Sequence, residues 1–369
     1  MNDFIAGIKE VRIFLMAGFL FYLAGCVSVP QDPETPEEGT AIHETVESSE
    51  VGIEKKEPPV VQKTKTPVTS SKIGSSQVGL EKTLNRLGAK IVPGLESSQW
   101  IINKGGVILK FVEGSRRAYW NDQIVFLNKP IVFNEGQMVI EKADVATFLK
   151  PALSDLKFKP RSDLIVIDPG HGGSEDGAKN EEMGLAEKEL TLDVSNRLKD
   201  HLESMGYRTL LTRYDDRLLP LKDRTEIANR ENAAVFISIH FNATLNETAE
   251  GIETYILTPE GQASTADSQG SGSYEKWAGN DFDALNARFA YEAQIDMLST
   301  LQRKDRGIKK ARFAVLKNLE CPGVLVECGF VSHKDEALLV RTPVYREKLA
   351  LSLSRSIDAF MGGVAKQPE

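Results

Sequence analysis

From residue 164 onward, short apolar runs alternate with stretches whose apolar residues recur at helical spacing. Leu190, Val194, Leu198 and Leu202 stand four residues apart and predict an amphipathic helix after the first run. Such alternation is typical of an α/β fold, and we expect a twisted, mostly parallel sheet flanked by helices. The apolar runs predict strands at residues 164–167, 208–212, 235–239, 252–257 and 324–327.

A smaller pattern precedes this α/β region. An amphipathic stretch around Leu80, Leu84 and Leu87 predicts a helix. We expect two folded domains, a small α+β domain at residues 77–155 and the α/β domain at residues 160–363. In the first of them, β-prone runs lie at residues 100–102, 107–112 and 124–133, followed by a helical stretch at 143–153.

Residues 1–76 indicate an export signal and a tether. An apolar stretch of signal-peptide length ends in Leu23-Ala24-Gly25-Cys26, which resembles a lipobox. The lipobox implies a lipoprotein signal peptide over residues 1–26, with Cys26 lipidated and attached to a membrane; the alternative is an ordinary signal peptide or short anchor. Residues 27–76 are rich in Pro, Glu, Thr, Ser and Lys, which predicts a disordered tether with an r.m.s. span of about 40 Å.

Composition narrows the functional classes. The chain is mildly acidic, with a formal charge of −8, and we expect no nucleic-acid partner. Cys321 and Cys328 flank a predicted strand, and their separation along an extended chain, about 23 Å, predicts that both are free thiols. Neither has a paired base nearby in the sequence, so a cysteine hydrolase is disfavoured. The lipobox and tether together place the protein in the cell envelope, on the periplasmic face of the outer membrane if the host is Gram-negative.

Two histidines stand where predicted strands end. His171 follows the strand at 164–167 through a Pro/Gly turn, and His240 directly follows the strand at 235–239. Ligands of open α/β sheets bind at the carboxyl ends of the strands. Two imidazoles and a carboxylate suit a catalytic zinc with an open position, and a second carboxylate can serve as base.

Two glutamates are candidates for these carboxylate roles. Glu187 falls in the first turn of the predicted helix, where the helix dipole alone would favour an acidic residue, and Glu189 competes for the ligand role. Glu327 closes an apolar run, so its carboxylate needs a cation, a water molecule or hydrogen bonds. Burial would raise the pKa of Glu327 toward that of a general base. A salt bridge to an arginine such as Arg213 is the structural alternative.

These residues lie in motifs that, in their order, resemble the zinc-dependent type 3 family of N-acetylmuramoyl-L-alanine amidases. The resemblance covers residues 164–361 approximately. The motifs are Ile167-Asp168-Pro169-Gly170-His171-Gly172-Gly173, Glu187-Lys188, Leu211-Thr212-Arg213, Ser238-Ile239-His240-Phe241-Asn242, Gly251-Ile252-Glu253-Thr254-Tyr255 and Leu325-Val326-Glu327-Cys328-Gly329-Phe330.

The resemblance implies that His171, Glu187 and His240 hold one Zn²⁺ and that Glu327 activates the attacking water. The substrate would be peptidoglycan, cleaved between N-acetylmuramic acid and the L-alanine of the stem peptide. Asn242 would contact the substrate, although Asn is also an ordinary residue at a strand end. Alternatives are a zinc peptidase acting within the stem peptide and a catalytically idle wall-binding lipoprotein. The presence of all four site residues disfavours the idle form.

Several other features stay open. Arg213 and Arg224 match the family pattern and are interpreted as structural, and His333 is interpreted as a loop residue. Some relatives carry a plugging helix before the catalytic Glu, but the helix predicted around Phe289 suits core packing better. An unidentified activator protein is a further candidate partner. Residues 114–127 are similar to the amino-terminal domain of copper amine oxidases, and this resemblance implies a wall-positioning module. Four of its residues either contact glycan or belong to the core of this domain: Arg116, Arg117, Tyr119 and Trp120.

Overall fold

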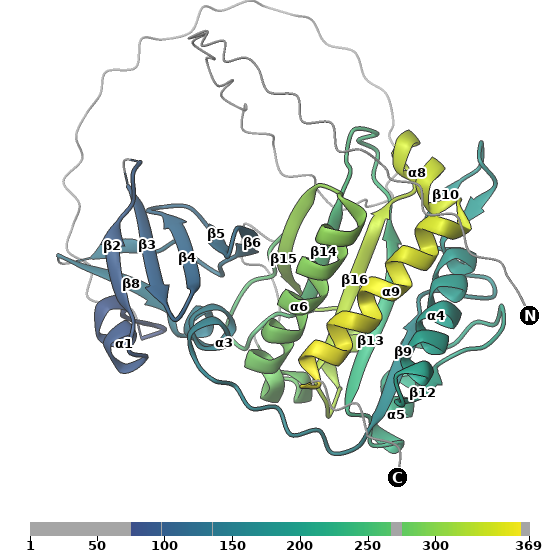
Figure 1. Ribbon diagram of the computed structural model, residues 1–369, viewed down its shortest axis with the longest axis horizontal. Coiled ribbons are helices and arrows are strands. Elements are labelled where there is room, and N and C mark those ends of the chain that lie inside the picture. Colours follow the sequence, from purple (N-terminus) through teal and green to yellow (C-terminus); the bar gives the residue numbers. More distant parts are fainter. Residues whose placement is uncertain (1–74, 97, 135, 267–274, 363–369) are drawn as a thin grey trace, which may run out of the picture. The chain divides into compact units, whose positions relative to one another are not determined.

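The computed structural model describes residues 75–96, 98–134, 136–266 and 275–362 (Figure 1). The predicted signal peptide, Cys26 and all but the last two residues of the predicted tether lie outside the described residues. No helix within the described ranges has the length and apolar character needed to cross a bilayer.

The α/β region forms around six strands of one sheet. Their spatial order is β12-β9-β13-β16-β14-β15, and every neighbouring pair is parallel except β14 and β16. The expected twisted, mostly parallel α/β sheet is confirmed. The strands are β9 (Leu164–Pro169), β12 (Arg208–Leu211), β13 (Val235–Asn242), β14 (Ile252–Leu257), β15 (Asp305–Ala311) and β16 (Gly323–Phe330).

Helices cover both faces of this sheet because alternate residues of its strands point to opposite sides. On β9, Ile165 and Ile167 belong to one buried cluster, with α4, α6 and α9, which lie side by side across one face in Figure 1. Leu164 and Val166 belong to the other cluster, with α5 and α7. The helices are α4 (Glu187–Ser204), α5 (Leu221–Arg230), η2 (Ala278–Phe282), α6 (Asp283–Leu301), α7 (Ala314–Lys317), α8 (Lys334–Val340) and α9 (Pro343–Phe360), and a short hairpin, β10 (Lys179–Asn180) with β11 (Leu185–Ala186), precedes α4.

The amino-terminal described region is antiparallel. Strands β2 to β6 form a meander, while β1, β8 and β7 form a separate three-stranded sheet. Its elements are β1 (Gln77–Gly79), α1 (Leu80–Arg86), β2 (Lys90–Pro93), β3 (Gln99–Lys104), β4 (Val107–Val112), β5 (Arg117–Trp120), β6 (Gln123–Phe126), β7 (Val132–Asn134), β8 (Gln137–Glu141), α2 (Lys142–Asp144), the π-helical turn η1 (Val145–Leu149) and α3 (Lys150–Leu153).

The single β-prone run expected at 124–133 is instead divided between two sheets, β6 and β7. Pro130 interrupts it, since proline cannot donate to a strand ladder, and the buried Asp144 carboxylate accepts hydrogen bonds from the backbone N–H groups of Asn128 and Lys129.

β6 also pairs with β15 through Val125 and Ile308, so strands from both predicted domains belong to one eleven-stranded sheet. Trp120, only 2% exposed, stacks on Tyr291 of α6 with ring centroids 4.0 Å apart. Trp120 is therefore a core residue and does not offer a surface for glycan. The domain boundaries themselves remain predictions.

Candidate functional site

His171 lies in the turn that follows β9, in a left-handed backbone conformation with φ of +61°. Non-glycine residues rarely adopt this conformation, and it persists where neighbours hold it in place. The Arg224 guanidinium donates to the His171 carbonyl over 2.8 Å, and Arg213 donates to the Gly170 carbonyl, also over 2.8 Å. Gly170 itself leaves room for the His240 ring, which a Cβ atom at that position would overlap.

Both arginines are almost completely buried and act behind the turn. Arg224 forms an ion pair with Asp168 at 2.8 Å. Asp168 also accepts from the hydroxyls of Thr212, which directly follows β12, and of Ser238 on β13. The arginines thus fix the path of the turn, in agreement with their structural interpretation.

Glu187 is the first residue of α4 and is 3% exposed. Its Oε1 accepts from the backbone N–H of Phe241, and its Oε2 accepts from that of Ala178. Burial would raise the pKa of Glu187, but hydrogen bonds with His171 and His240 outweigh it and hold the pKa well below the usual range.

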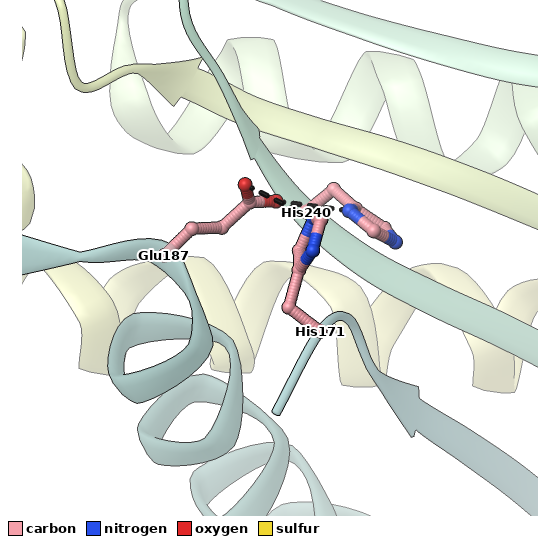
Figure 2. A group of neighbouring side chains, drawn as sticks. All are labelled: His171, Glu187 and His240. Carbon is pink, nitrogen blue, oxygen red and sulfur yellow. Dashed lines mark hydrogen bonds and ion pairs between the residues drawn. The ribbon is translucent and has the colours of Figure 1, made fainter. Parts of the chain in front are cut away.

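His171, Glu187 and His240 converge from three separate elements, as Figure 2 shows. Each offers one ligand atom, and these atoms lie within 4.8 Å of one another. Glu187 oxygens stand 3.2 Å from His171 Nε2 and 2.9 Å from His240 Nδ1. Ligand atoms of a tetrahedral zinc are about 3.4 Å apart, given Zn–N distances near 2.1 Å, so the spacing and the donor set fit zinc. Glu189 is not part of the group.

Glu327 lies beside this group, opposite His240 in the pairing of β16 with β13. Its Oε2 is buried without a hydrogen-bond partner among the described residues. Burial raises its pKa well above the usual value, and the charges of Glu187 and Glu253 add to the effect. Arg213 donates to the carbonyls of the β9 turn, so the alternative salt bridge does not form.

A cavity of about 500 Å³ opens over these four side chains. Asn242 also lines it, and its Nδ2 donates to Glu253 over 2.9 Å. His333 lies elsewhere: it caps α8, where its ring accepts from the Glu336 N–H, as expected of a loop residue. The apolar part of the lining comes from Ala178, Leu221, Phe241, Ala243, Phe313, Ala314, Val315 and Leu325.

The sequence interpretation assigned no role to Glu253, although its signal was visible. Glu253 interrupts the apolar run of β14 as Glu327 interrupts that of β16. Its carboxylate is almost completely buried and binds Arg306 and Lys309 of β15. A buried acid in a strand predicts a partner, but only the fold identifies that partner.

Known proteins resemble the part of the chain that contains these site residues. Residues 165–359 match the Amidase_3 family, described as N-acetylmuramoyl-L-alanine amidase. The chain is 30% identical to the Escherichia coli amidase AmiA over 53% of its length and 75% of AmiA. It is 29% identical to the Bacillus subtilis amidase LytC over 72% of its length but about half, 52%, of LytC. A solved Clostridium difficile 630 amidase is 28% identical, covering 55% of this chain and 97% of that one, with a TM-score of 0.46.

Proposed function

The chain belongs to the N-acetylmuramoyl-L-alanine amidase family. On that premise we propose that it hydrolyses peptidoglycan with one zinc ion, in the cavity over the four side chains described above, which we call the groove. The bond cleaved is the amide between N-acetylmuramic acid and the L-alanine of the stem peptide. One observation carries the proposal: three ligand-type atoms converge within 4.8 Å beside a carboxylate whose buried oxygen has no partner among the described residues.

His171, Glu187 and His240 are the proposed ligands of this ion. Zinc bound there supplies a Lewis acid that polarises the scissile carbonyl and makes water a stronger nucleophile. The backbone N–H groups of Ala178 and Phe241, which donate to the Glu187 carboxylate, and the arginines behind His171 hold these groups in place before substrate arrives. Such preorganisation avoids the cost of rearrangement during the reaction.

Glu327 is the proposed general base and acid. Its carboxylate accepts a proton from the attacking water as the new C–O bond forms at the scissile carbonyl carbon. It then returns that proton to the L-alanine nitrogen as the C–N bond breaks, leaving a lactyl carboxylic acid and a free amine. Phe313, Val315 and Leu325 keep the surrounding wall apolar, which strengthens electrostatic interactions inside the groove.

Product identification tests the proposal. Purified protein should contain one zinc per chain and release from sacculi stem peptides that begin with L-alanine, and a chelator should stop the release. Peptides cleaved within the stem would instead support the peptidase alternative. A zinc-loaded protein that releases neither product would overturn the assignment and support the idle wall-binding form.

The proposed location is the cell envelope, with attachment to a membrane through lipidated Cys26 and a wall-positioning role for the amino-terminal domain. The expected result is that Cys26→Ser moves the protein from the membrane fraction to the soluble fraction without changing its activity on isolated wall. Membrane association that survives this substitution would contradict the lipid anchor.

A further inference from the structure

Glu253 stands in a row of three side chains that crosses the sheet at the groove. In the pairing of β14 with β16 it lies opposite Glu327, which in turn lies opposite His240 of β13. Opposed residues in neighbouring strands share a face of the sheet. Glu253 is therefore the next residue beyond the proposed base, on the side away from the proposed metal ligands.

Four side-chain donors saturate the Glu253 carboxylate. Arg306 and Lys309 donate to Oε2, the first over 2.9 Å. Asn242 and Tyr255 donate to Oε1 over 2.9 and 2.8 Å. Burial would raise the pKa of Glu253, but the charges of Lys309 and Arg306 outweigh it and lower the pKa. The group is thus an ionised carboxylate, which accepts hydrogen bonds and donates none.

Because the Glu253 carboxylate only accepts hydrogen bonds, it fixes the orientation of the Asn242 side-chain amide. If Asn242 turned over, its carbonyl would meet the carboxylate, and two buried acceptors would face each other without a proton between them. The NH₂ group must therefore point to Glu253. The side-chain oxygen of Asn242, Oδ1, has no hydrogen-bond partner among the residues that the structure describes, and the residue lines the groove.

We propose that Glu253 is a positioning residue that holds the Asn242 amide so that its carbonyl accepts a hydrogen bond from an N–H group of the stem peptide. The inference rests on the proposed function, because it supposes a peptide in the groove. It makes Asn242 an acceptor, so the groove selects a ligand that presents an amide N–H at this point. Arg306 and Lys309 keep Glu253 ionised and aligned.

A charge-conserving exchange of the Asn242 and Glu253 side chains tests which of the two donates the hydrogen bond between them. In the double variant Asn242→Asp with Glu253→Gln, the new amide can donate to the new carboxylate while its own oxygen still accepts from Arg306 and Lys309. The groove keeps an acceptor and the total charge is unchanged. In Glu253→Gln alone, the inserted NH₂ faces the Asn242 NH₂, so Asn242 turns over and presents a donor. In Asn242→Asp alone, two carboxylates meet.

The measurements are kcat and KM on a soluble muropeptide, zinc affinity and melting temperature for all four proteins. Each single variant should lose roughly three- to tenfold in kcat/KM, mainly through KM, as expected for one neutral hydrogen bond. The double variant should return to within about twofold of the wild type, and zinc affinity should stay constant throughout. Asn242→Ala should lose as much as Glu253→Gln, and combining them should cost little more.

Two results would overturn the inference: a Glu253→Gln variant with wild-type kinetics, or a double variant no better than the worse single variant while zinc affinity and melting temperature are retained. Both differ from failure of the proposed function, in which the wild-type protein itself neither holds zinc nor releases L-alanyl peptides.

Discussion

The carboxylates of Glu187 and Glu327 line the same groove, but their hydrogen bonding differs and their pKa values are shifted in opposite directions. Glu187, at the start of α4, receives hydrogen bonds from two backbone N–H groups and two imidazoles, and its pKa is lowered. Glu327, in the middle of β16, has a buried oxygen without a partner among the described residues, and burial raises its pKa. The difference agrees with the two roles proposed for them, in which Glu187 is fixed as an anion and Glu327 exchanges a proton.

The surroundings of the two residues explain the contrast. The turn after β9 and the start of α4 are rich in polar contacts, with Arg213, Arg224 and Asp168 buried behind them. The β16 strand is apolar on either side of Glu327. An ionised group is retained in the first environment and destabilised in the second. The same contrast recurs between Glu327 and its neighbour Glu253, whose charge two cations balance.

The largest expected effect comes from removing the unpaired carboxylate. Glu327→Gln should lower kcat on muropeptides by roughly 10²- to 10⁴-fold, the usual contribution of general acid–base catalysis, while zinc affinity stays unchanged. Glu320→Gln, the same change at an exposed position, is the matched control. Turnover within a few-fold of the wild type would remove Glu327 from the proposed chemistry.

Removing the saturated carboxylate should act on the metal instead. Glu187→Ala should weaken zinc binding by more than the roughly 10- to 100-fold typical of losing an outer-shell partner. Competition with a chromogenic chelator measures the dissociation constant. Glu189→Ala, two residues along the same helix, should bind zinc like the wild type. Equal losses in both variants would show that Glu187 is not a specific ligand.

The polar frame behind the ligands should carry stability. Arg224→Met removes one partner of a buried ion pair and leaves Asp168 without its cation, which should lower the free energy of unfolding by about 3–5 kcal/mol. Arg208→Met breaks an exposed ion pair with Asp163 and should cost about 1 kcal/mol or less. Urea denaturation measures both. Similar values for the two variants would mean that burial does not distinguish these pairs.

The smallest expected effect is on how the stability of the metal-free protein depends on pH. Glu253 and Glu327 should contribute to this dependence with opposite signs. The pKa of Glu253 is lowered from 4.5, so its stabilisation is present above that pH and is lost as pH falls through the folded-state pKa. The pKa of Glu327 is raised from 4.5, so its stabilisation is present below that pH and is lost as pH rises through the folded-state pKa.

Unfolding free energies measured against pH test this sign. Glu253→Gln should flatten the acidic side of the stability profile. Glu327→Gln should remove the loss at higher pH and raise stability at neutral pH by about 1–3 kcal/mol, the cost of a buried unsatisfied group. Profiles that change in the same direction in both variants would contradict the contrast between the two glutamates.

Local pattern predicted much of the fold. The five apolar runs form β9, β12, β13, β14 and β16, and the periodic leucines and valine form α4, because burial on both faces selects continuous apolar strands and burial on one face selects helical spacing. Cys321 and Cys328 are both free, as expected, and the structure shows that both are also buried. β15 was not predicted, since four of its seven residues, Asp305, Arg306, Lys309 and Lys310, are charged.

The partners of three of those charges explain why β15 is nevertheless a strand in the interior of the sheet. Arg306 and Lys309 contact Glu253 on β14. Lys310, 2% exposed, pairs with Asp144 at 3.5 Å and donates to the Phe126 carbonyl. The groups that compensate these three cations lie more than fifty residues away along the chain. A sequence window shows the charges but not what neutralises them.

The sequence by itself determined that His171 and His240 lie near the carboxyl ends of strands, that Glu187 opens a helix and that Glu327 interrupts an apolar run. Turn residues, helical periodicity and strand hydrophobicity determine these features because they act over a few neighbouring residues. Only the tertiary structure decided that β14 lies between β16 and β15, antiparallel to the first and parallel to the second, which brings Glu253 beside Glu327 and within reach of Asn242. Strand order and register arise from contacts between distant segments, and these contacts decide that the Glu253 carboxylate is satisfied while Glu327 keeps an oxygen without a partner among the described residues.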